Sequence, residues 1–194
     1  AGEHILDRED DDVAAEVAAS LEALGVTIHT GARASRVSAA PDGGVVVSAR
    51  DGREARGSHL LVALGRSPVT ANLGLEAAGV ETTERGFVKV DDHLRTSAEG
   101  VYAAGDVAGT PQFTHASWND FRVLRDLLAG KEASTAGRLI PWAVFTTPEL
   151  GHVGLTEAEA RAAGHEVRVA KTPTAAVPRA KTLGRTEGFY KVVV

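Results

Sequence analysis

The side chain best placed for chemistry is Asp106, which follows a glycine in the segment TSAEGVYAAGD at residues 96–106. The apolar run at 101–104 lies between two glycines and predicts a short buried strand. Gly105 has no Cβ, so a ligand can approach the backbone closely. A carboxylate at the carboxyl end of such a strand lies where open α/β sheets bind ligands, and it can accept hydrogen bonds from ligand hydroxyls. An isolated Gly-Asp pair is more often a turn or a cap, so the surrounding pattern must decide.

The residues after this pair predict a helix over 114–128. Its apolar side chains recur close to helical spacing. They are Ala116, Phe121, Val123, Leu124, Leu127 and Leu128. Thr114 is the expected N-cap, since its hydroxyl can accept from a free backbone N–H of the first turn. The whole segment therefore predicts a ligand-binding turn held between a strand and a helix.

A second glycine-containing turn, Gly65 followed by Arg66, comes after the apolar run 59–64. That run predicts a buried parallel strand. Alone, Arg66 would be a solvated loop arginine, but its place after a buried strand and before the Gly-Asp turn favours a binding role. Upstream, a helix is expected at 13–24, and the preceding aspartates are interpreted as favourable charges at its amino end rather than as a metal site. Strands are expected at 26–30, 34–38, 45–50 and 53–56.

The remaining elements lie on either side of a composition change at residues 130–137, which predicts a domain boundary. Before it, a strand is expected at 86–91. After it, Thr156 and Glu159 form a capping-box pattern that predicts a helix over 157–163. Strands are expected at 167–170 and 189–194, and Arg179 with Lys181 is interpreted as a solvated basic patch on a strand edge.

Composition excludes several classes of function. The chain has 194 residues, 43% of them hydrophobic, and a net charge of −5, which gives no support to nucleic-acid binding. No apolar run is long enough to cross a bilayer, and the acidic start is unlike a signal peptide, so no membrane partner and a cytoplasmic location are expected. The seven histidines show no zinc-site spacing, and the absence of Cys excludes a thiol or a disulfide within these residues. The absence of Met suggests an excised or processed piece of a longer protein.

Three motifs carry a resemblance to a known family. The string T-S-x-x-G-V-Y-A-A-G-D-V resembles the second flavin-binding motif of flavoproteins with two dinucleotide-binding domains, and more narrowly of the pyridine nucleotide-disulfide oxidoreductases. A-L-G-R at 63–66 resembles the family's A-T-G-R segment, with Leu64 in place of the usual Thr. FTTPELGHVGLTEAEA at 145–160 resembles the opening of its dimerisation domain.

The resemblance implies an α/β fold that becomes α+β at the carboxyl end. Three segments are expected: 1–64, the second half of an NAD(P)-binding domain; 65–137, the end of an FAD-binding domain; and 138–194, the start of a dimerisation domain. It also implies a cofactor-binding role for the following residues, with no catalytic residue and no metal ligand assigned. FAD is expected at Gly105, Asp106, Thr114, His115 and Ala116, and NAD(P) at Ala34, Ala63, Gly65 and Arg66. His115 is expected to position the flavin rather than to act as an acid or base.

The implied function is that of a fragment of an FAD-dependent NAD(P)H oxidoreductase, with electrons passing through flavin to a dithiol, disulfide or metal ion. The stretch PQFTHASWNDFRVL most resembles the mercuric-reductase-like branch. Homodimerisation through 138–194 is expected, but G-x-G-x-x-G and C-x-x-x-x-C are missing, so this chain alone is expected to be inactive. Two alternatives remain: a non-catalytic remnant or assembly module, and a fragment of a flavin NADH oxidase or ferredoxin-type reductase. The choice between NAD and NADP and the final electron acceptor stay undecided.

Overall fold

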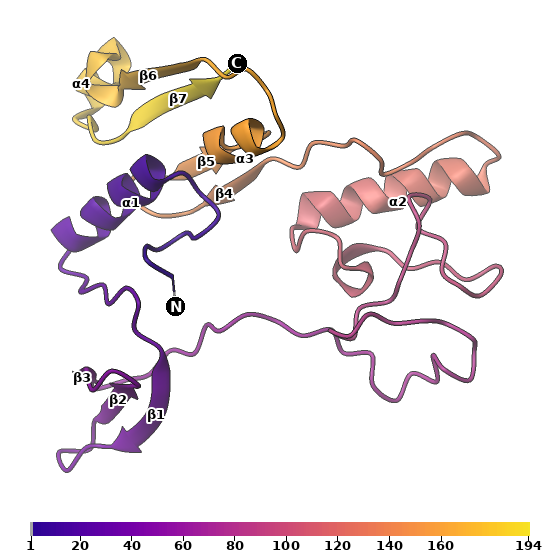
Figure 1. Cartoon of the computed structure of the whole chain (residues 1–194), viewed down its shortest axis with the longest axis horizontal. Coiled ribbons are helices and arrows are strands. Elements are labelled where there is room, and N and C mark those ends of the chain that lie inside the picture. The colour runs from indigo at the N-terminus through magenta and orange to yellow at the C-terminus, as the bar shows by residue number, and fades with distance from the viewer. Residues whose placement is uncertain (1) are drawn as a thin grey trace. The chain divides into compact units, whose positions relative to one another are not determined.

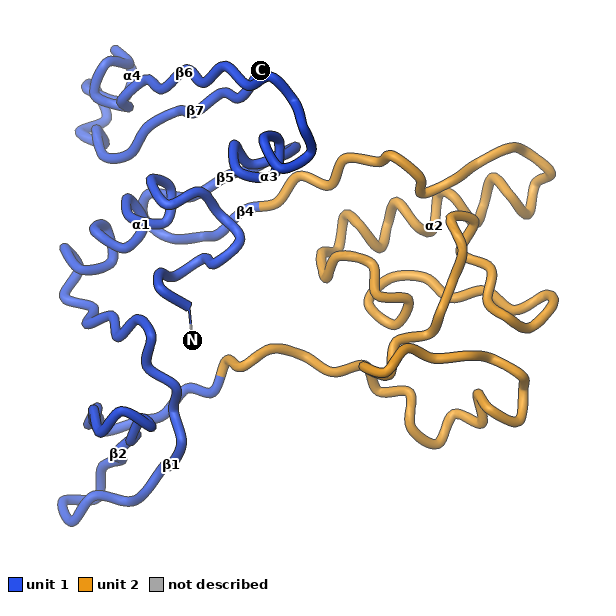
Figure 2. Tube along the Cα trace, in the orientation of Figure 1, with its two compact units in different colours: residues 1–62, 143–194 blue, residues 63–142 orange. Residues whose placement is uncertain are grey.

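The computed structural model describes residues 2–194, which form two compact units (Figures 1 and 2). Unit 1 combines residues 1–62 with 143–194, and unit 2 consists of residues 63–142. The unit boundaries lie near the predicted segment boundaries at 64/65 and 137/138. The sequence did not predict that the first and last segments would share one unit. The mixture of helices and strands agrees with the predicted α/β character.

The amino-terminal part of unit 1 is a helix followed by an antiparallel sheet, as predicted. The helix buries Ala14 and Val17 and carries aspartates in its first turn. The three strands form a meander in the order β1-β2-β3, with a bulge between Ala34 and Arg36. The elements are α1 (Asp11–Ala23), β1 (Ala34–Ala39), β2 (Val45–Ala49) and β3 (Glu54–Gly57).

The carboxy-terminal part of unit 1 contains two two-stranded sheets, β4-β5 and the antiparallel β6-β7, together with two short α-helices (Figure 1). The predicted capping box is confirmed: the Thr156 hydroxyl accepts from the Glu159 backbone, and the Glu159 carboxylate accepts from the Thr156 backbone. The interpretation of Arg179 and Lys181 as a strand edge is wrong, because Pro178 starts a helical turn there. The elements are β4 (Trp142–Val144), β5 (Leu150–His152), α3 (Glu157–Ala162), β6 (Val169–Pro173), η2 (Thr174–Ala176), α4 (Pro178–Leu183) and β7 (Phe189–Val193).

Ion pairs join the two parts of unit 1. Lys191 on β7 places its ammonium 2.9 Å from Asp10, 3.1 Å from Asp12 and 3.0 Å from Glu157. The Asp10 carboxylate also accepts from the first backbone N–H groups of α3. The aspartates at the start of α1 therefore do more than balance the helix dipole, since they hold the last strand and α3 against α1.

Unit 2 contains one long helix, α2 (Thr114–Leu128), and one 3-10 turn, η1 (Gly105–Ala108). The helix has the predicted bounds, but the prediction that Thr114 is its N-cap is wrong. Phe113 occupies that position in an extended conformation, and no side chain caps the helix. The strands expected at 86–91 and 101–104 are reduced to single bridges, Thr82 with Val88 and Arg95 with Tyr102.

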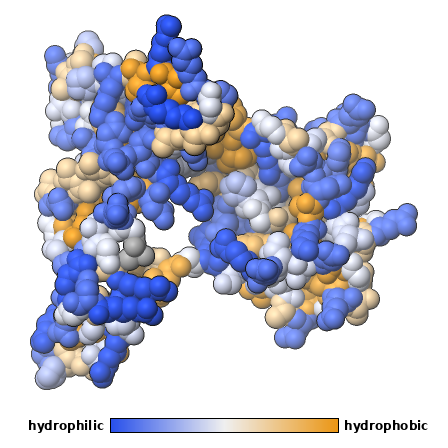
Figure 3. Space-filling model, viewed as in Figure 1, coloured by the Kyte–Doolittle hydropathy of each residue, from blue (hydrophilic) through white to orange (hydrophobic). Residues whose placement is uncertain are grey.

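Two predicted strands do not form. Residues 26–30 and 59–64 are irregular, and in the second run Leu61 and Leu64 are 90% and 91% exposed. A buried parallel strand needs a paired neighbour on each side, and the described residues place no strand beside this run. Apolar side chains are accordingly visible on the surface of both units (Figure 3). No helix in the described range is long and apolar enough to span a membrane.

Candidate ligand-binding site

A pocket of about 510 Å³ in unit 2 brings together three of the predicted binding residues, Arg66, Asp106 and Thr114. Its volume lies within the range typical of small-molecule sites. The three residues come from the irregular segment after residue 62, from η1 and from the first turn of α2. Residues 40 positions apart in the chain thus share one cavity in a single unit.

The carboxylate of Asp106 is free to bind a ligand. Asp106 is exposed and is the second residue of η1, where its backbone carbonyl accepts from the Gly109 N–H at 3.1 Å. Among residues 2–194, none donates a hydrogen bond to the carboxylate or forms an ion pair with it. Asp106 therefore lines the pocket with a carboxylate that has no partner among the described residues.

The backbone conformation of Gly105 favours glycine, since its φ of +72° lies in the left-handed region that residues with a Cβ rarely adopt. A Cβ built at this position would lie 2.8 Å from the Ser117 hydroxyl oxygen, so that hydroxyl would have to move. The residue is buried, and its N–H donates to the Asp120 carboxylate at 2.7 Å. The turn that carries Asp106 is therefore packed directly against α2.

The amino end of α2 reaches the pocket through Phe113 and Thr114. Because no side chain caps this helix, its first backbone N–H groups remain available as donors. Such an end carries a partial positive charge and attracts anionic or electron-rich groups. Ala116, in the same turn, is fully buried, so its small size allows the helix to pack closely.

His115 does not line the pocket. Its Nε2–H donates to the Pro141 carbonyl at 2.6 Å, and its ring stacks on Phe113 with centroids 5.3 Å apart. These contacts hold the start of α2 and engage the Nε2 atom of His115. The role of His115 beside a flavin stays a prediction.

The other predicted nucleotide-binding residues are not gathered at this pocket. Ala63 and Gly65 lie in the exposed irregular segment that leads to Arg66, and Gly65 has a φ of +112°. Ala34 belongs to unit 1, at the bulge of β1. Their assignment to NAD(P) stays a prediction.

Sequence reasoning missed the aromatic wall of the pocket. Phe113, Trp118 and Phe121 line it, and the rings of the last two lie 4.8 Å apart. Trp118 and Phe121 are three residues apart, which places them on one helical face. That spacing was a signal that could have predicted a surface for a planar ring.

Sequence reasoning also missed Asp120, whose side chain is completely buried. Its carboxylate accepts from the Gly105 N–H and the Thr110 hydroxyl, each at 2.7 Å, and pairs with Arg138. Asp120 lies four residues after Ala116 and three before Val123, on the buried face of α2. An acidic residue within an apolar stripe was the signal, because buried carboxylates are normally paired.

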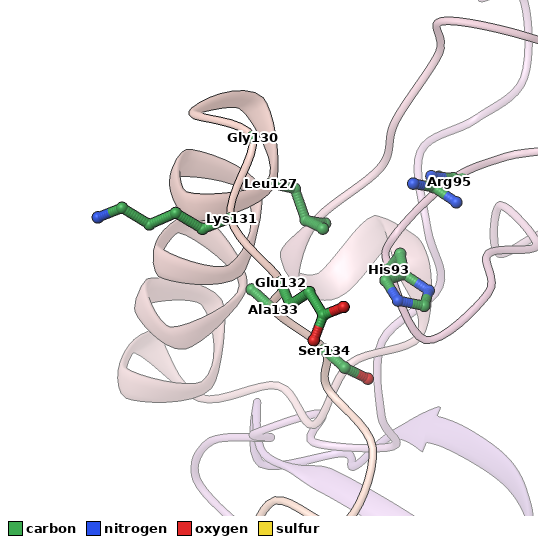
Figure 4. Close-up of a pocket in the computed structure, with 8 residues that line it drawn as sticks. All are labelled: His93, Arg95, Leu127, Gly130, Lys131, Glu132, Ala133 and Ser134. Atoms are coloured by element: carbon green, nitrogen blue, oxygen red, sulfur yellow. The ribbon is translucent and has the colours of Figure 1, made fainter.

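A larger hollow of about 730 Å³ lies elsewhere in unit 2, between the 93–95 loop and the residues that follow α2 (Figure 4). His93, Arg95, Glu132 and Ser134 line it, and the Lys131 side chain points away from the other labelled side chains. It contains none of the predicted binding residues. The smaller pocket is therefore the better candidate, because its free carboxylate and uncapped helix converge on one cavity.

Comparison with known proteins places this geometry in a family. Residues 1–120 match the model for pyridine nucleotide-disulphide oxidoreductases, and residues 140–194 match the model for the dimerisation domain of the same proteins. RclA of Escherichia coli, described as a probable pyridine nucleotide-disulfide oxidoreductase, is 40% identical over 191 residues, covering 97% of this chain and 43% of the relative. The dihydrolipoyl dehydrogenase of Thermus scotoductus is 44% identical over 193 residues, covering 97% and 42%.

Solved structures agree with the sequence comparisons. The HOCl-induced flavoprotein disulfide reductase RclA from Escherichia coli matches with a TM-score of 0.91 at 40% identity, over 100% of this chain and 44% of that one. LpdA from Mycobacterium tuberculosis matches with a TM-score of 0.88 at 33% identity, over 99% and 42%. The chain thus spans less than half the length of these relatives. Since a family model covers more than half of its residues, the chain belongs to the pyridine nucleotide-disulphide oxidoreductase family.

Proposed function

We propose that this chain is part of an FAD-dependent NAD(P)H oxidoreductase and that the pocket beside Asp106 binds the flavin cofactor. The observation that carries the proposal is the convergence of an unpartnered carboxylate and an uncapped helix start on one pocket. Family membership and the description of RclA as a flavoprotein disulfide reductase support it.

The residues present fit FAD. The Asp106 carboxylate has no internal donor, so it can accept hydrogen bonds from the hydroxyls of the ribityl chain. The free N–H groups at Thr114 and His115 suit an electron-rich ring edge, because the helix start carries partial positive charge. Trp118 and Phe121 supply a flat apolar surface next to these polar groups. Gly105 keeps the backbone of the turn close to α2, so that the Asp106 side chain reaches the cavity.

FAD, when bound, accepts a hydride from NAD(P)H and passes electrons onward, which is chemistry that no side chain here performs. The chain's own residues bind and orient. Asp106 accepts ligand hydroxyls, His115 fixes the first turn of α2 through the Pro141 carbonyl, and Arg66 supplies a positive charge at the pocket rim. In this proposal Ala63 and Gly65 contact NAD(P), and Ala34 lies near its adenine end.

For the electron acceptor we propose a dithiol or disulfide, with a metal ion as in mercuric reductases as the alternative. The chain contains no Cys, so any redox-active dithiol must come from outside these residues. The name of RclA as a disulfide reductase favours the first acceptor. The match to a dimerisation domain at 140–194 supports a homodimer formed through the last segment.

The test is purification of the complete product of the gene that encodes these residues, followed by its visible absorption spectrum. Near-stoichiometric flavin is expected, with Asp106→Ala reducing retention and Asp126→Ala, a change on α2 outside the pocket, leaving it unchanged. NAD(P)H oxidation is then measured with a disulfide and with Hg²⁺ as acceptors, which separates the two proposals. A product without bound or added-back flavin contradicts the proposal and favours a non-catalytic assembly module.

A further inference from the structure

The two ends of the turn that carries Asp106 donate hydrogen bonds to the same buried oxygen atom. Oδ2 of Asp120 accepts from the backbone N–H of Gly105 and from the hydroxyl of Thr110, both at 2.7 Å. Residues 105 and 110 are the first and last of a six-residue segment, and Asp106 lies between them. The two bonds therefore close the segment into a loop anchored on α2.

The carboxylate is held in place by a counter-charge. Arg138 donates to Oδ1 of Asp120 at 2.5 Å and to the Asn119 side chain at 2.8 Å. Its side chain is 17% exposed, whereas that of Asp120 is fully buried. Among the described residues no buried side-chain nitrogen or oxygen lacks a hydrogen-bond partner, which is the condition under which a buried polar network rigidifies its surroundings.

Apart from these two hydrogen bonds, the loop contains few contacts that could orient Asp106. Its own carboxylate has no partner within residues 2–194, so the backbone alone sets its direction. That backbone departs from Gly105 at a φ of +72° and closes at Gly109 at a φ of +76°. Fixing the N–H of Gly105 fixes the Ala104–Gly105 peptide plane, from which the loop leads into Asp106.

We propose that Asp120 is a positioning residue that clamps the flavin-binding loop through Gly105 and Thr110, with Arg138 as its charge partner. The inference rests on the proposed function and adds to it a residue that does not touch the ligand. Hydrogen bonds to a charged acceptor are about twice as strong as those to a neutral one. The charge of Asp120, rather than its shape alone, is what keeps the loop in one conformation.

The first test needs no flavin and uses the 194-residue chain. Asp120→Asn keeps the shape of the side chain but removes its charge, and Asp126→Asn on the same helix is the matched control. Amide exchange of Gly105, followed by NMR, is expected to rise about tenfold in Asp120→Asn and not in the control, since a charge-assisted bond becomes a neutral one. Unchanged exchange at Gly105 in a folded variant overturns the clamp.

A second pair of variants separates positioning from general destabilisation. Asp120→Asn leaves Arg138 without its charge partner, so the double variant Asp120→Asn with Arg138→Gln is expected to recover thermal stability. It is not expected to recover the slow exchange of Gly105. If both recover together, Asp120 acts only through stability and the inference is wrong. Thr110→Val removes the bond from Thr110 to Asp120 and the 3.5 Å contact from Arg138 to the Thr110 hydroxyl, and it replaces Asp120→Asn in the exchange and FAD measurements if the latter fails to fold.

The last test measures FAD affinity in the complete gene product, by titrating FAD into the flavin-free protein. Asp120→Asn is expected to bind FAD about tenfold more weakly and Thr110→Val about threefold more weakly. Asp126→Asn is expected to bind FAD with unchanged affinity. Weaker binding in Asp106→Ala but not in Asp120→Asn overturns the clamp and leaves the proposed function standing. If neither Asp106→Ala nor Asp120→Asn changes the affinity, the proposed function is wrong and the inference falls with it, whatever Gly105 exchange shows.

Discussion

Lys191 is the residue whose replacement should most weaken unit 1. Its ammonium lies within 3.1 Å of the carboxylates of Asp10, Asp12 and Glu157, and its side chain is 10% exposed. The closest of these partners, Asp10, is 13% exposed. Lys191→Met keeps most of the apolar stem and removes the charge, so three acidic groups lose their common partner.

The magnitude follows from the most buried pair. Removing one partner of a buried ion pair costs roughly 3–5 kcal/mol because the other charge stays desolvated. Asp10 keeps two backbone donors from the start of α3, which lowers the cost. We expect a loss of about 2–3 kcal/mol in the free energy of unfolding of unit 1, or about 30- to 150-fold faster amide exchange in α1 and β7. Lys89→Met in unit 2, which breaks one exposed pair with Glu81, should cost less than about 1 kcal/mol.

The pH dependence gives an independent check. Burial acts to raise the pKa of Asp10, but the hydrogen bonds from Lys191, Glu157 and Ala158 outweigh it and hold the pKa below its ordinary value of 3.8. This contribution to stability is therefore present above pH 3.8 and is lost as the pH falls through the lowered pKa. Lys191→Met should flatten that acid dependence. Equal exchange rates in the variant and the parent chain at pH 7 would refute the reasoning.

Three further outcomes are expected. Burial acts to lower the pKa of His152, but its carboxylate partner outweighs burial and raises the pKa above 6.5. The resulting stability of unit 1 is present below pH 6.5 and is lost as the pH rises through the raised pKa. His152→Gln should remove this pH dependence, which denaturation at pH 6 and at pH 8.5 would measure. Gly105→Ala should strain the turn at residues 105–110, because alanine disfavours a φ of +72° and its Cβ would displace the Ser117 hydroxyl. An unchanged NMR spectrum of the turn would contradict this prediction. Phe145→Ser replaces an apolar side chain that is 86% exposed, and Leu61→Ser, at a side chain 90% exposed, is its control. Phe145→Ser should weaken self-association, measured by sedimentation, more than Leu61→Ser does. Equal effects would exclude the last segment as the association surface.

The prediction about His152 depends on both of its ring nitrogens. Nδ1 lies 2.9 Å from the Glu9 carboxylate, and Nε2 lies 3.0 Å from the Gly154 carbonyl. Both partners are acceptors, so the ring satisfies them together only when it carries two protons. The Glu9 side chain is 4% exposed, which keeps the pair out of reach of most solvent. Sequence reasoning found that the histidines lack zinc-site spacing, and the pairing of His152 with a residue 143 positions away could not be read from spacing.

Local patterns predicted the elements that local interactions stabilise. The helix at 114–128, the capping box of Thr156 and the β1-β2-β3 meander all depend on residues a few positions apart, and each has close to its predicted bounds. The failures at 26–30 and 59–64 concern strands, whose backbone groups need a partner from elsewhere in the chain. Apolar composition alone predicted those strands, but the described residues offer them no neighbour.

The sequence singled out residues that line the candidate site, but not the buried residues that hold them in place. Asp106, Arg66 and Thr114 were singled out because the motifs around them resemble those of a known family, and the structure places all three at one pocket. Asp120 and Arg138 act through buried contacts 15 and 18 positions long, and no short motif marks them.

The two networks have different consequences for the molecule. Lys191 pairs with Asp10 and Asp12, which lie 181 and 179 positions away, and so holds unit 1 together; loss of these pairs should appear as global opening of that unit. The contacts of Asp120 span residues 105–138 inside unit 2, and what they determine is the direction of one free carboxylate. Buried charge thus stabilises one unit and orients a side chain in the other. A measurement of unfolding alone would miss the second role, because a loop can lose its single conformation while the helix beneath it stays folded.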